Sequence, residues 1–171
     1  YYAADEKPGI SKILNLLSQG KKVAYVSDAG TPGISDPGSS LVRAVREEGY
    51  RITPIPGASA LSALISVSGV QGRGITFEGF LSPKPGRRLS RIKELMEKEE
   101  SFIIYESPYR IVKAMTDIAS VDPERQVVAG REMTKLHEEF ICGTASEVLA
   151  DLQSRDKIQG EFAVCIYGRK N

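Results

Sequence analysis

The segment that most constrains the fold is residues 27–38, which hold three glycines and two prolines in twelve positions. Glycine permits positive φ and proline fixes φ near −65°, so this loop is both tight and stiff. An apolar run at residues 22–26 precedes it and predicts a buried strand. Residues 41–45 follow with a helical apolar pattern, for which Asp36 is the expected N-cap and Pro37 the first residue. Open α/β sheets bind their ligands at such strand-to-helix loops.

The charged residues of this loop restrict the ligand that it can hold. Asp28 and Asp36 place carboxylates near its two ends, whereas phosphates are bound by bare backbone amides and a lysine. The G-x-x-x-x-G-K-[ST] motif does not occur in the chain. A cationic or zwitterionic ligand therefore suits the loop better than a phosphate. The same composition is equally compatible with a plain tight connection that binds nothing.

Composition is that of an ordinary globular protein. The chain has 171 residues, 41% hydrophobic and 26% charged, which suits one domain or two small ones. Lysine and arginine (23) nearly balance aspartate and glutamate (22), so any nucleic-acid surface must be a local patch. No apolar run approaches the roughly 20 residues that cross a bilayer, and no signal-peptide pattern is present. We therefore expect a soluble, cytoplasmic protein without a membrane partner.

The cysteines and the single histidine give no sign of a metal site. Cys142 and Cys165 lie in apolar, strand-like runs without metal-ligand spacing, which predicts buried, reduced thiols. His137 lies among charged residues, as expected for a solvated loop side chain. We therefore expect no bound metal.

The first half of the chain shows a β-α-β pattern. An apolar face at residues 10–17 predicts a helix that ends before Gly20. The run at 22–26, a helix at about 37–48 and a run at 50–55 form one βαβ unit, so the two strands should be parallel. Residues 56–60 make a second tight turn that opens a helix of small residues, which suits either a bound ligand or close helix packing.

The second half predicts a mixed sheet. Glycine-rich residues 69–74 form the expected linker, with an N-terminal α/β domain at residues 1–72 and a C-terminal α/β domain at residues 73–171. The C-terminal part contains about five strands and three helices. Strands near 125–130 and 138–143 are consecutive and can pair in antiparallel fashion. The fold class is therefore α/β, with two tandem domains and a ligand cleft between them.

A basic cluster occupies residues 84–93, which hold five positive charges and no acid. The segment follows a Pro/Gly loop and precedes a group of glutamates, so it suits a solvated, ion-paired helix. The segregation of charge also suits contacts with RNA phosphates. The candidate RNA-binding residues are Lys84, Arg87, Arg88 and Arg91.

Glu106 stands at the carboxyl end of a predicted buried strand, just before a helix. That position favours a functional carboxylate. A salt bridge to Arg110 is the structural alternative. Further along, Thr144 and Glu147 have the spacing of a helix capping box.

Four motifs, in the same order over nearly the whole chain, resemble the tetrapyrrole methylase superfamily. They are D-A-G-T-P-G-I-S-D-P-G at 28–38, P-I-P-G-A-S-A at 54–60, Y-E-S-P-Y-R at 105–110 and R-E-M-T-K at 131–135. Within that superfamily the sequence is most similar to the ribosomal RNA small-subunit methyltransferase I family. The fold implied has two α/β domains, and in the family a further strand and turn precede the part seen here.

The resemblance implies S-adenosyl-L-methionine as the cofactor. Its sulfonium is a cation that carbonyl oxygens can surround, and its methionine part is a zwitterion, so the aspartate-flanked loop meets both needs. The positions that the resemblance assigns to cofactor binding are Asp28, Ala29, Gly30, Pro32, Gly33, Ser59, Ala60, Glu106, Met133, Thr134, Phe162 and Ala163.

The implied reaction is 2'-O-methylation of a cytidine in 16S ribosomal RNA of the small ribosomal subunit, by a homodimer. The ribose hydroxyl must lose a proton, and the candidate acceptors are Glu106, Asp28 and Lys135, in that order. Carbon methylation of a porphyrinoid is an alternative, although those enzymes usually carry Gly-Gly-Asp-Pro where this chain has residues 27–30. A cofactor-binding fragment without catalysis is the other alternative, because the family's first strand is not in this chain.

Overall fold

The structure is a computed structural model that describes residues 6–28, 30–71 and 74–169. Its contacts divide the chain into two compact units, residues 1–59 and 60–171. Helix α3 (Ala60–Ser68) belongs to the second unit, because it packs against strand β5 (Phe162–Ile166). The boundary between residues 72 and 73 that the sequence suggests stays a prediction, and residues 72–73 are not among those described.

The first unit contains two helices, α1 (Glu6–Ser18) and α2 (Ser39–Glu47), which pack against each other. Both end where the sequence predicts, at glycines with φ of 75° (Gly20) and 76° (Gly49). In each case the glycine N–H bonds the carbonyl three residues back, and the next N–H bonds the carbonyl five residues back. This is the Schellman arrangement, which requires the left-handed backbone that glycine adopts without strain.

Helix α2 begins later than the sequence predicts. Its N-cap is Gly38, with φ of 127° and no side-chain cap hydrogen bond, and Ser39 is its first residue. The predictions of Asp36 as N-cap and Pro37 as first helical residue are therefore wrong. The physical reason lies in the loop: the carbonyl of Pro37 accepts a hydrogen bond from the Tyr25 hydroxyl, and the backbone turns at Gly38 before the helix can start.

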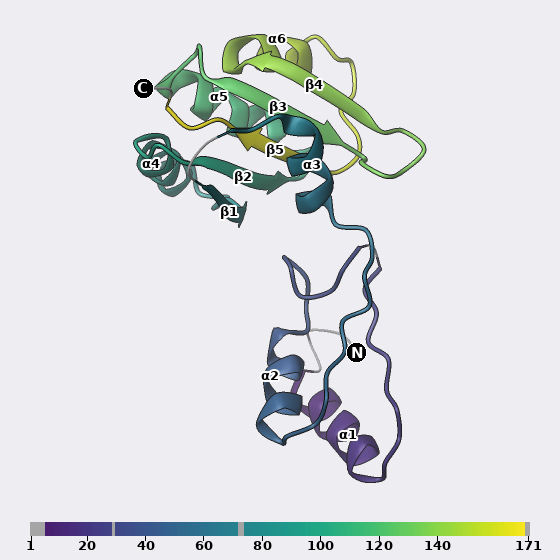
Figure 1. Cartoon of the computed structure of the whole chain (residues 1–171). Helices are drawn as coiled ribbons and strands as arrows, with labels where there is room; N and C mark the ends of the chain where they lie inside the picture. The colour runs from purple at the N-terminus through teal and green to yellow at the C-terminus, as the bar shows by residue number, and fades with distance from the viewer. Residues whose placement is uncertain (1–5, 29, 72–73, 170–171) are drawn as a thin grey trace. The chain divides into compact units, whose positions relative to one another are not determined.

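The two strands predicted at residues 22–26 and 50–55 are not formed. Both segments lack a strand ladder, and Figure 1 draws them as plain coil flanking the helices. Val26 and Ile55 are each 79% exposed. A strand needs a neighbour for its backbone hydrogen bonds and a covered face for its side chains, and the described part of this unit supplies neither.

The second unit is an α/β domain around one mixed sheet, which confirms the predicted fold class. Besides α3 and β5, its elements are β1 (Ile75–Phe80), α4 (Pro85–Met96), β2 (Ser101–Glu106), α5 (Ile111–Val121), β3 (Gln126–Arg131), β4 (Glu139–Thr144) and α6 (Ala145–Gln153). The strand order is β1-β2-β5-β3-β4. Strands β1 and β2 are parallel, and the other pairs are antiparallel, including the predicted β3–β4 pair.

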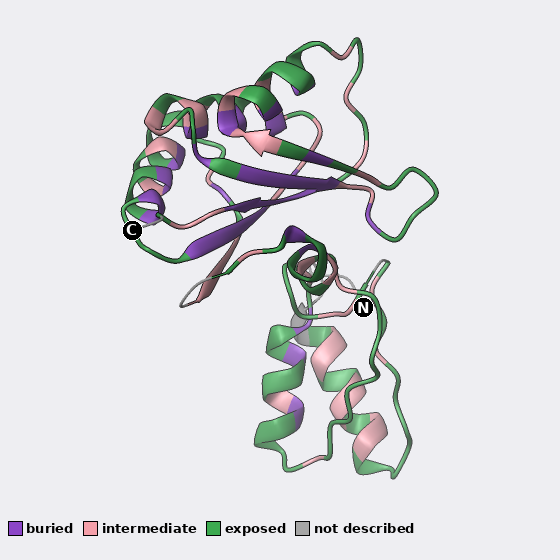
Figure 2. Cartoon of the chain, turned by 45° about the horizontal axis from the view of Figure 1, so that its top comes forward, coloured by how far each residue is buried: buried purple, intermediate pink, exposed green. Residues whose placement is uncertain are grey.

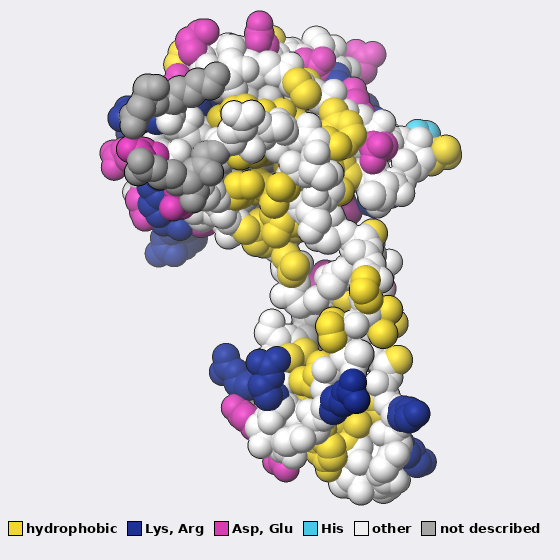
Figure 3. Space-filling model, viewed as in Figure 1, with side chains coloured by type: hydrophobic (Ala, Val, Ile, Leu, Met, Phe, Trp, Pro, Cys, Tyr) yellow, Lys and Arg dark blue, Asp and Glu magenta, His cyan; other side chains and the backbone are white. Residues whose placement is uncertain are grey.

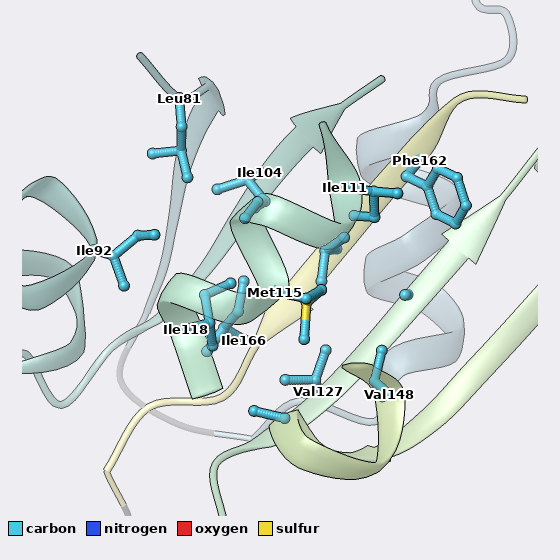
Figure 4. Packing of buried hydrophobic residues seen from close by; sticks show 14 of the residues in the cluster. Leu81, Ile92, Ile104, Ile111, Met115, Ile118, Val127, Val148, Phe162 and Ile166 are labelled. Carbon is cyan, nitrogen blue, oxygen red and sulfur yellow. The ribbon is translucent and has the colours of Figure 1, made fainter. Parts of the chain in front are cut away.

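Each face of this sheet carries its own apolar cluster. Helices α4, α5 and α6 cover one face, where Ile104, Met115, Ile118 and Ile166 are fully buried (Figures 1 and 4). On the other face Leu64 of α3 packs with residues of β2, β3 and β5. Figure 2 shows the resulting contrast, with buried strands in this unit and mostly exposed coil in the first. The sheet is therefore a rigid support for the loops at its ends.

The cysteines differ from each other. Cys165 is buried in β5, and burial raises the pKa of its thiol to about 11, so it is an inert core residue. Cys142 on β4 is exposed, which corrects the prediction that both are buried. Alternation along β4 explains the difference, because Ile141 points into the core and its neighbour points away. Among the described residues, no helix is both long and apolar enough to cross a membrane.

Candidate functional site

The glycine-rich loop at residues 27–38 meets the second predicted turn within the first unit. Thr31 Oγ1 donates a hydrogen bond to the Ala58 carbonyl at 3.1 Å. A Cβ added to Gly30 would lie 3.2 Å from that same carbonyl, so a larger residue would press on the contact. Ser27 Oγ closes the loop by donating to the Gly30 carbonyl at 2.8 Å. The structure therefore brings together two of the four motifs that the sequence singled out.

Tyr25 anchors the other end of the loop, a role that the sequence reasoning did not find. Its hydroxyl donates to the Pro37 carbonyl at 2.6 Å, and its ring would lie 2.6 Å from a Cβ at position 38. Gly38 is thus needed both for its φ and for the room that it leaves. Partial burial, followed by the charge of Asp36, raises the pKa of Tyr25, so the phenol keeps the proton that it donates.

The loop leaves its first carboxylate uncommitted. Asp28 is exposed, and its side chain has no hydrogen bond or ion pair with any described residue. Pro32 is half-buried, whereas Gly30 and Gly33 are exposed with φ of 73° and 90°. Ala29, the other residue predicted here, lies outside the described residues. A free carboxylate beside exposed glycine residues is suited to a cationic ligand.

Ser59 and Ala60 of the second motif stand on either side of the division between the units. Ser59 is half-buried and is the last residue of the first unit, and Ala60 is exposed at the start of α3. Of the helix that follows, Leu64 is fully buried. Close packing of this small-residue helix, one of the two alternatives that the sequence left open, is therefore observed.

Five other predicted residues lie at one end of the sheet in the second unit. Strands β2 and β3 both finish beside the start of β5, because Glu106 and Arg131 each pair with Phe162. One residue on, Ala163 packs in the same apolar cluster as Met133, which lies in the loop after β3. A Cβ on Gly130 would lie 2.5 Å from the Met133 sulfur, so a larger residue would force the Met133 side chain to shift. Thr134 follows at once in this loop and is exposed.

Glu106 forms the salt bridge that was its structural alternative. Its side chain is 1% exposed and pairs with Arg110 Nη2 at 2.7 Å. The same oxygen, Oε1, accepts the Ser107 N–H at 2.8 Å. The Arg110 guanidinium in turn lies 6.0 Å from the centroid of the Phe80 ring. A buried carboxylate held in this way is suited to stabilising the turn after β2, and a substrate hydroxyl could reach it only after a rearrangement.

Lys135 fastens two loops together. Its Nζ lies 3.0 Å from both Glu132 Oε1 and Glu161 Oε2, and these carboxylates raise its pKa. Glu132 Oε1 also accepts the Glu161 N–H, and the Glu132 N–H donates to the Glu161 carbonyl. A lysine whose pKa is raised stays protonated at neutral pH, so it cannot accept a proton from a ribose hydroxyl. The geometry favours a positioning role for Lys135.

A second ionic cluster, also absent from the sequence analysis, supports the base of the same loop. Glu139 accepts hydrogen bonds from Arg131 Nε at 2.7 Å and from two Arg155 nitrogens at 2.8 and 2.7 Å. Arg155, followed by Arg131, lowers the pKa of Glu139 to about 2. Arg131 also donates to the Gln159 carbonyl at 3.2 Å. The cluster thus ties the β3–β4 hairpin to the segment that leads into β5.

The four candidate RNA-binding residues separate into two pairs. Lys84 and Arg87 are exposed at the start of α4. Arg88 is only 5% exposed and pairs with Asp117 at 2.6 Å. Arg91 forms two hydrogen bonds with Glu78, at 2.8 and 2.7 Å, and an ion pair with Glu94. Arg88 and Arg91 are therefore committed to contacts inside the unit, which corrects the expectation that they face RNA.

A family model described as "Tetrapyrrole (Corrin/Porphyrin) Methylases" matches residues 5–149. The chain therefore belongs to the tetrapyrrole methylase family, and it is a methyltransferase of the S-adenosylmethionine-dependent kind.

Within this family, the chain is similar to curated proteins that share one name. Proteins named ribosomal RNA small subunit methyltransferase I are 41% identical in Borrelia garinii subsp. bavariensis, 39% in Neisseria meningitidis serogroup B and 41% in Thermotoga maritima. The matches cover 96%, 95% and 97% of this chain, and 74%, 56% and 74% of those proteins. The resemblance inferred from the four motifs is confirmed.

Solved structures agree on the fold. The methyltransferase CobJ matches 95% of this chain and 72% of its own, with a TM-score of 0.68 at 17% identity. A diphthine synthase matches 98% and 68%, with a TM-score of 0.64 at 16% identity. Uroporphyrin-III C-methyltransferase from Thermus thermophilus, crystallised with S-adenosyl homocysteine, matches 94% and 73%, with a TM-score of 0.58 at 12% identity. At these identities the likeness concerns the fold.

Proposed function

We propose that this chain transfers a methyl group from S-adenosylmethionine to the 2'-hydroxyl of a cytidine in 16S ribosomal RNA. The relatives named ribosomal RNA small subunit methyltransferase I support the choice of substrate. The observation in this structure that carries the proposal is the loop at residues 27–38, which is held by Tyr25 at Pro37 and by Ala58 at Thr31 and carries an uncommitted aspartate. For the alternative, porphyrinoid methylation, the support is limited to the description of the family, which names corrin and porphyrin methylases.

In this proposal the loop binds the charged part of the methyl donor. The Asp28 carboxylate and the backbone around Gly30, Pro32 and Gly33 offer oxygens to the sulfonium and the amino group. Ala29 and the Ser59–Ala60 turn complete the site. Transfer to a hydroxyl is an in-line displacement, so fixing donor and acceptor in line supplies much of the rate, up to about 7–11 kcal/mol of the barrier.

For the adenine of the donor, the candidate residues that the family resemblance supplies are those at the β2–β5–β3 end of the second unit. Met133 and Ala163 provide apolar surface there, and Thr134 and Phe162 provide backbone groups at the ends of β3 and β5. The ionic contacts of Lys135 and Glu139 hold this loop in place. The loop after β3 is therefore held in place before any ligand binds, which supports its proposed role in binding the adenine.

Asp28 is the best of the three candidate proton acceptors. It is exposed and unpaired among the described residues, whereas Glu106 is buried in a salt bridge and Lys135 remains protonated. Lys84 and Arg87 stay in the proposal as RNA-facing residues, because both are exposed. Self-association and a cytoplasmic location stay predictions, and light scattering of the purified chain tests the first.

Calorimetric titration with S-adenosylmethionine, followed by methyl transfer to purified small ribosomal subunits, tests the proposal. We expect Asp28→Ala to remove detectable cofactor binding and Asp36→Ala, in the same loop, to retain it, with equal thermal stability in both. Binding without transfer by the unmodified chain would favour a non-catalytic fragment. Transfer to a porphyrinoid but not to the subunits would favour the other alternative, and no binding at all would reject the proposal.

A further inference from the structure

A groove in the first unit lies between the glycine-rich loop and α2. Its volume is about 720 Å³, inside the roughly 300–1,000 Å³ typical of small-molecule sites. Its lining includes three apolar residues, Pro32, Ile34 and Val42, and two arginines, Arg43 and Arg46. Ile34 and Val42 are 39% and 37% exposed, so the apolar lining is open to solvent. The sequence analysis did not predict this groove, because its candidate RNA-binding residues all lie at residues 84–93.

The two arginines that line the groove are uncommitted. Both are exposed, and neither guanidinium forms an ion pair or hydrogen bond with a residue that the structure describes. Glu47, on the same helix, is the one acid that lines the groove. Figure 3 shows lysine and arginine side chains on the part of this unit that carries α2, and others over the rest of the unit. By contrast, Arg88 and Arg91 of the second unit are already neutralised by carboxylates.

We propose that this groove binds the phosphate backbone of the RNA substrate, an inference that rests on the proposed function. Residues three apart on a helix lie on one face, so both guanidinium groups can reach the same stretch of strand. Arginine binds phosphate with two parallel hydrogen bonds and remains charged at all relevant pH values. The apolar lining residues would cover the face of a sugar or a base.

The groove adjoins the loop that is proposed to hold the methyl donor. Pro32 and Gly33 line the groove and also belong to the loop proposed to hold the methyl donor. An RNA strand seated on Arg43 and Arg46 would therefore run beside that loop. The groove acts in this view as the part of the site that brings the ribose to the methyl group, rather than as a general basic surface.

Salt-dependent RNA binding tests the inference. A fluorescent oligoribonucleotide of small-subunit ribosomal sequence is titrated with the full chain and with Arg43→Gln/Arg46→Gln over a range of salt. Each phosphate contact on a single strand contributes about 0.7 to the slope of log affinity against log salt, so the double variant should lose about 1.4, and each single variant about 0.7. The matched control is Lys12→Gln/Lys22→Gln, which removes two exposed charges of the same unit outside the groove.

The outcomes separate the two proposals. A slope change in the arginine variant at least twice that of the lysine control, with unchanged affinity for S-adenosylmethionine, supports the groove. Equal changes in both double variants, or none in either, overturn it while leaving ribosomal RNA as the substrate. If the unmodified chain binds the cofactor but no RNA at any salt, the proposed function fails, and the groove proposal fails with it.

Discussion

The two units of this chain use their charged side chains in opposite ways. In the second unit most of the charged residues that the sequence marked are already paired, Lys84 and Arg87 excepted: Glu106 pairs with Arg110, Lys135 with two glutamates, and Arg88 with Asp117. In the first unit Asp28, Arg43 and Arg46 have no partner among the described residues. Paired charges stabilise a fold, whereas unpaired charges beside a groove remain available to a ligand. Charged contacts with the methyl donor are therefore expected from the first unit.

The units also differ in how they hold their backbone. The second unit shares backbone hydrogen bonds across five strands and buries both faces of its sheet. The described part of the first unit has two helices and two segments without a ladder, joined at a few points such as Thr31–Ala58. The backbone of the second unit is therefore held by its sheet, whereas that of the first unit depends on local contacts.

Hydrogen exchange provides the largest expected difference. Amides in β2 and β5 should exchange only through global opening, with free energies approaching the roughly 5–15 kcal/mol of a small domain. Amides at residues 22–26 and 50–55 should open at close to zero cost, because they lack a ladder. Exchange of the full chain, followed by mass spectrometry of peptides, measures both. Equal protection in the two units would break the comparison and restore the parallel strands predicted from the sequence.

Truncating one isoleucine in each unit should give the second-largest difference, in the free energy of unfolding. Ile104→Ala should lower the free energy of unfolding by about 2–5 kcal/mol, because Ile104 is fully buried and leaves a cavity. The matched change Ile55→Ala should alter it by less than about 0.5 kcal/mol, because Ile55 is 79% exposed. Urea denaturation followed by circular dichroism checks both variants. A large loss from Ile55→Ala would mean that the segment is covered.

The ionic cluster around Glu139 should make the stability of the second unit depend on pH. Glu139→Gln should lower the free energy of unfolding by about 1–3 kcal/mol at pH 7, because charge-assisted hydrogen bonds to two arginines are weakened.

The pKa of Glu139 is about 2 in the folded chain, against an ordinary 4.5. The stabilisation by its ionised carboxylate is therefore full above about pH 4.5 and is lost as pH falls toward 2. Denaturation at pH 7, 5 and 3 should show the two proteins converging at the lowest pH. Glu94→Gln, at an exposed carboxylate, is the control that should show little difference at any pH.

Helix capping gives the smallest expected effect. Thr144 and Glu147 form a complete capping box at the start of α6, so Thr144→Ala should cost about 1 kcal/mol. Helix α2 has no side-chain cap, and Ser39→Ala at its first residue should change stability by less than about 0.5 kcal/mol. Thermal unfolding of both variants measures the difference. Equal losses would show that the start of α2 is held by contacts that these two hydroxyls do not explain.

Much of the fold followed from local sequence patterns. The Thr144–Glu147 box, the glycine-terminated helices and the antiparallel β3–β4 pair are confirmed, because each depends on residues close together in the chain. Predictions that depended on a distant partner did less well. Arg88 and Arg91 looked free because Asp117 and Glu78 lie 29 and 13 positions away. The strands at 22–26 and 50–55 have the right composition but no neighbour in the described residues.

The sequence by itself determined the family, the mixed α/β class and the loop at residues 27–38, because these depend on which residues occur and in what order. Only the tertiary structure decided which charges are available. Whether a carboxylate or guanidinium can serve a ligand depends on what lies within about 3–4 Å of it. That neighbour comes from another element: Glu161 for Lys135, Arg155 for Glu139, and no described residue for Asp28.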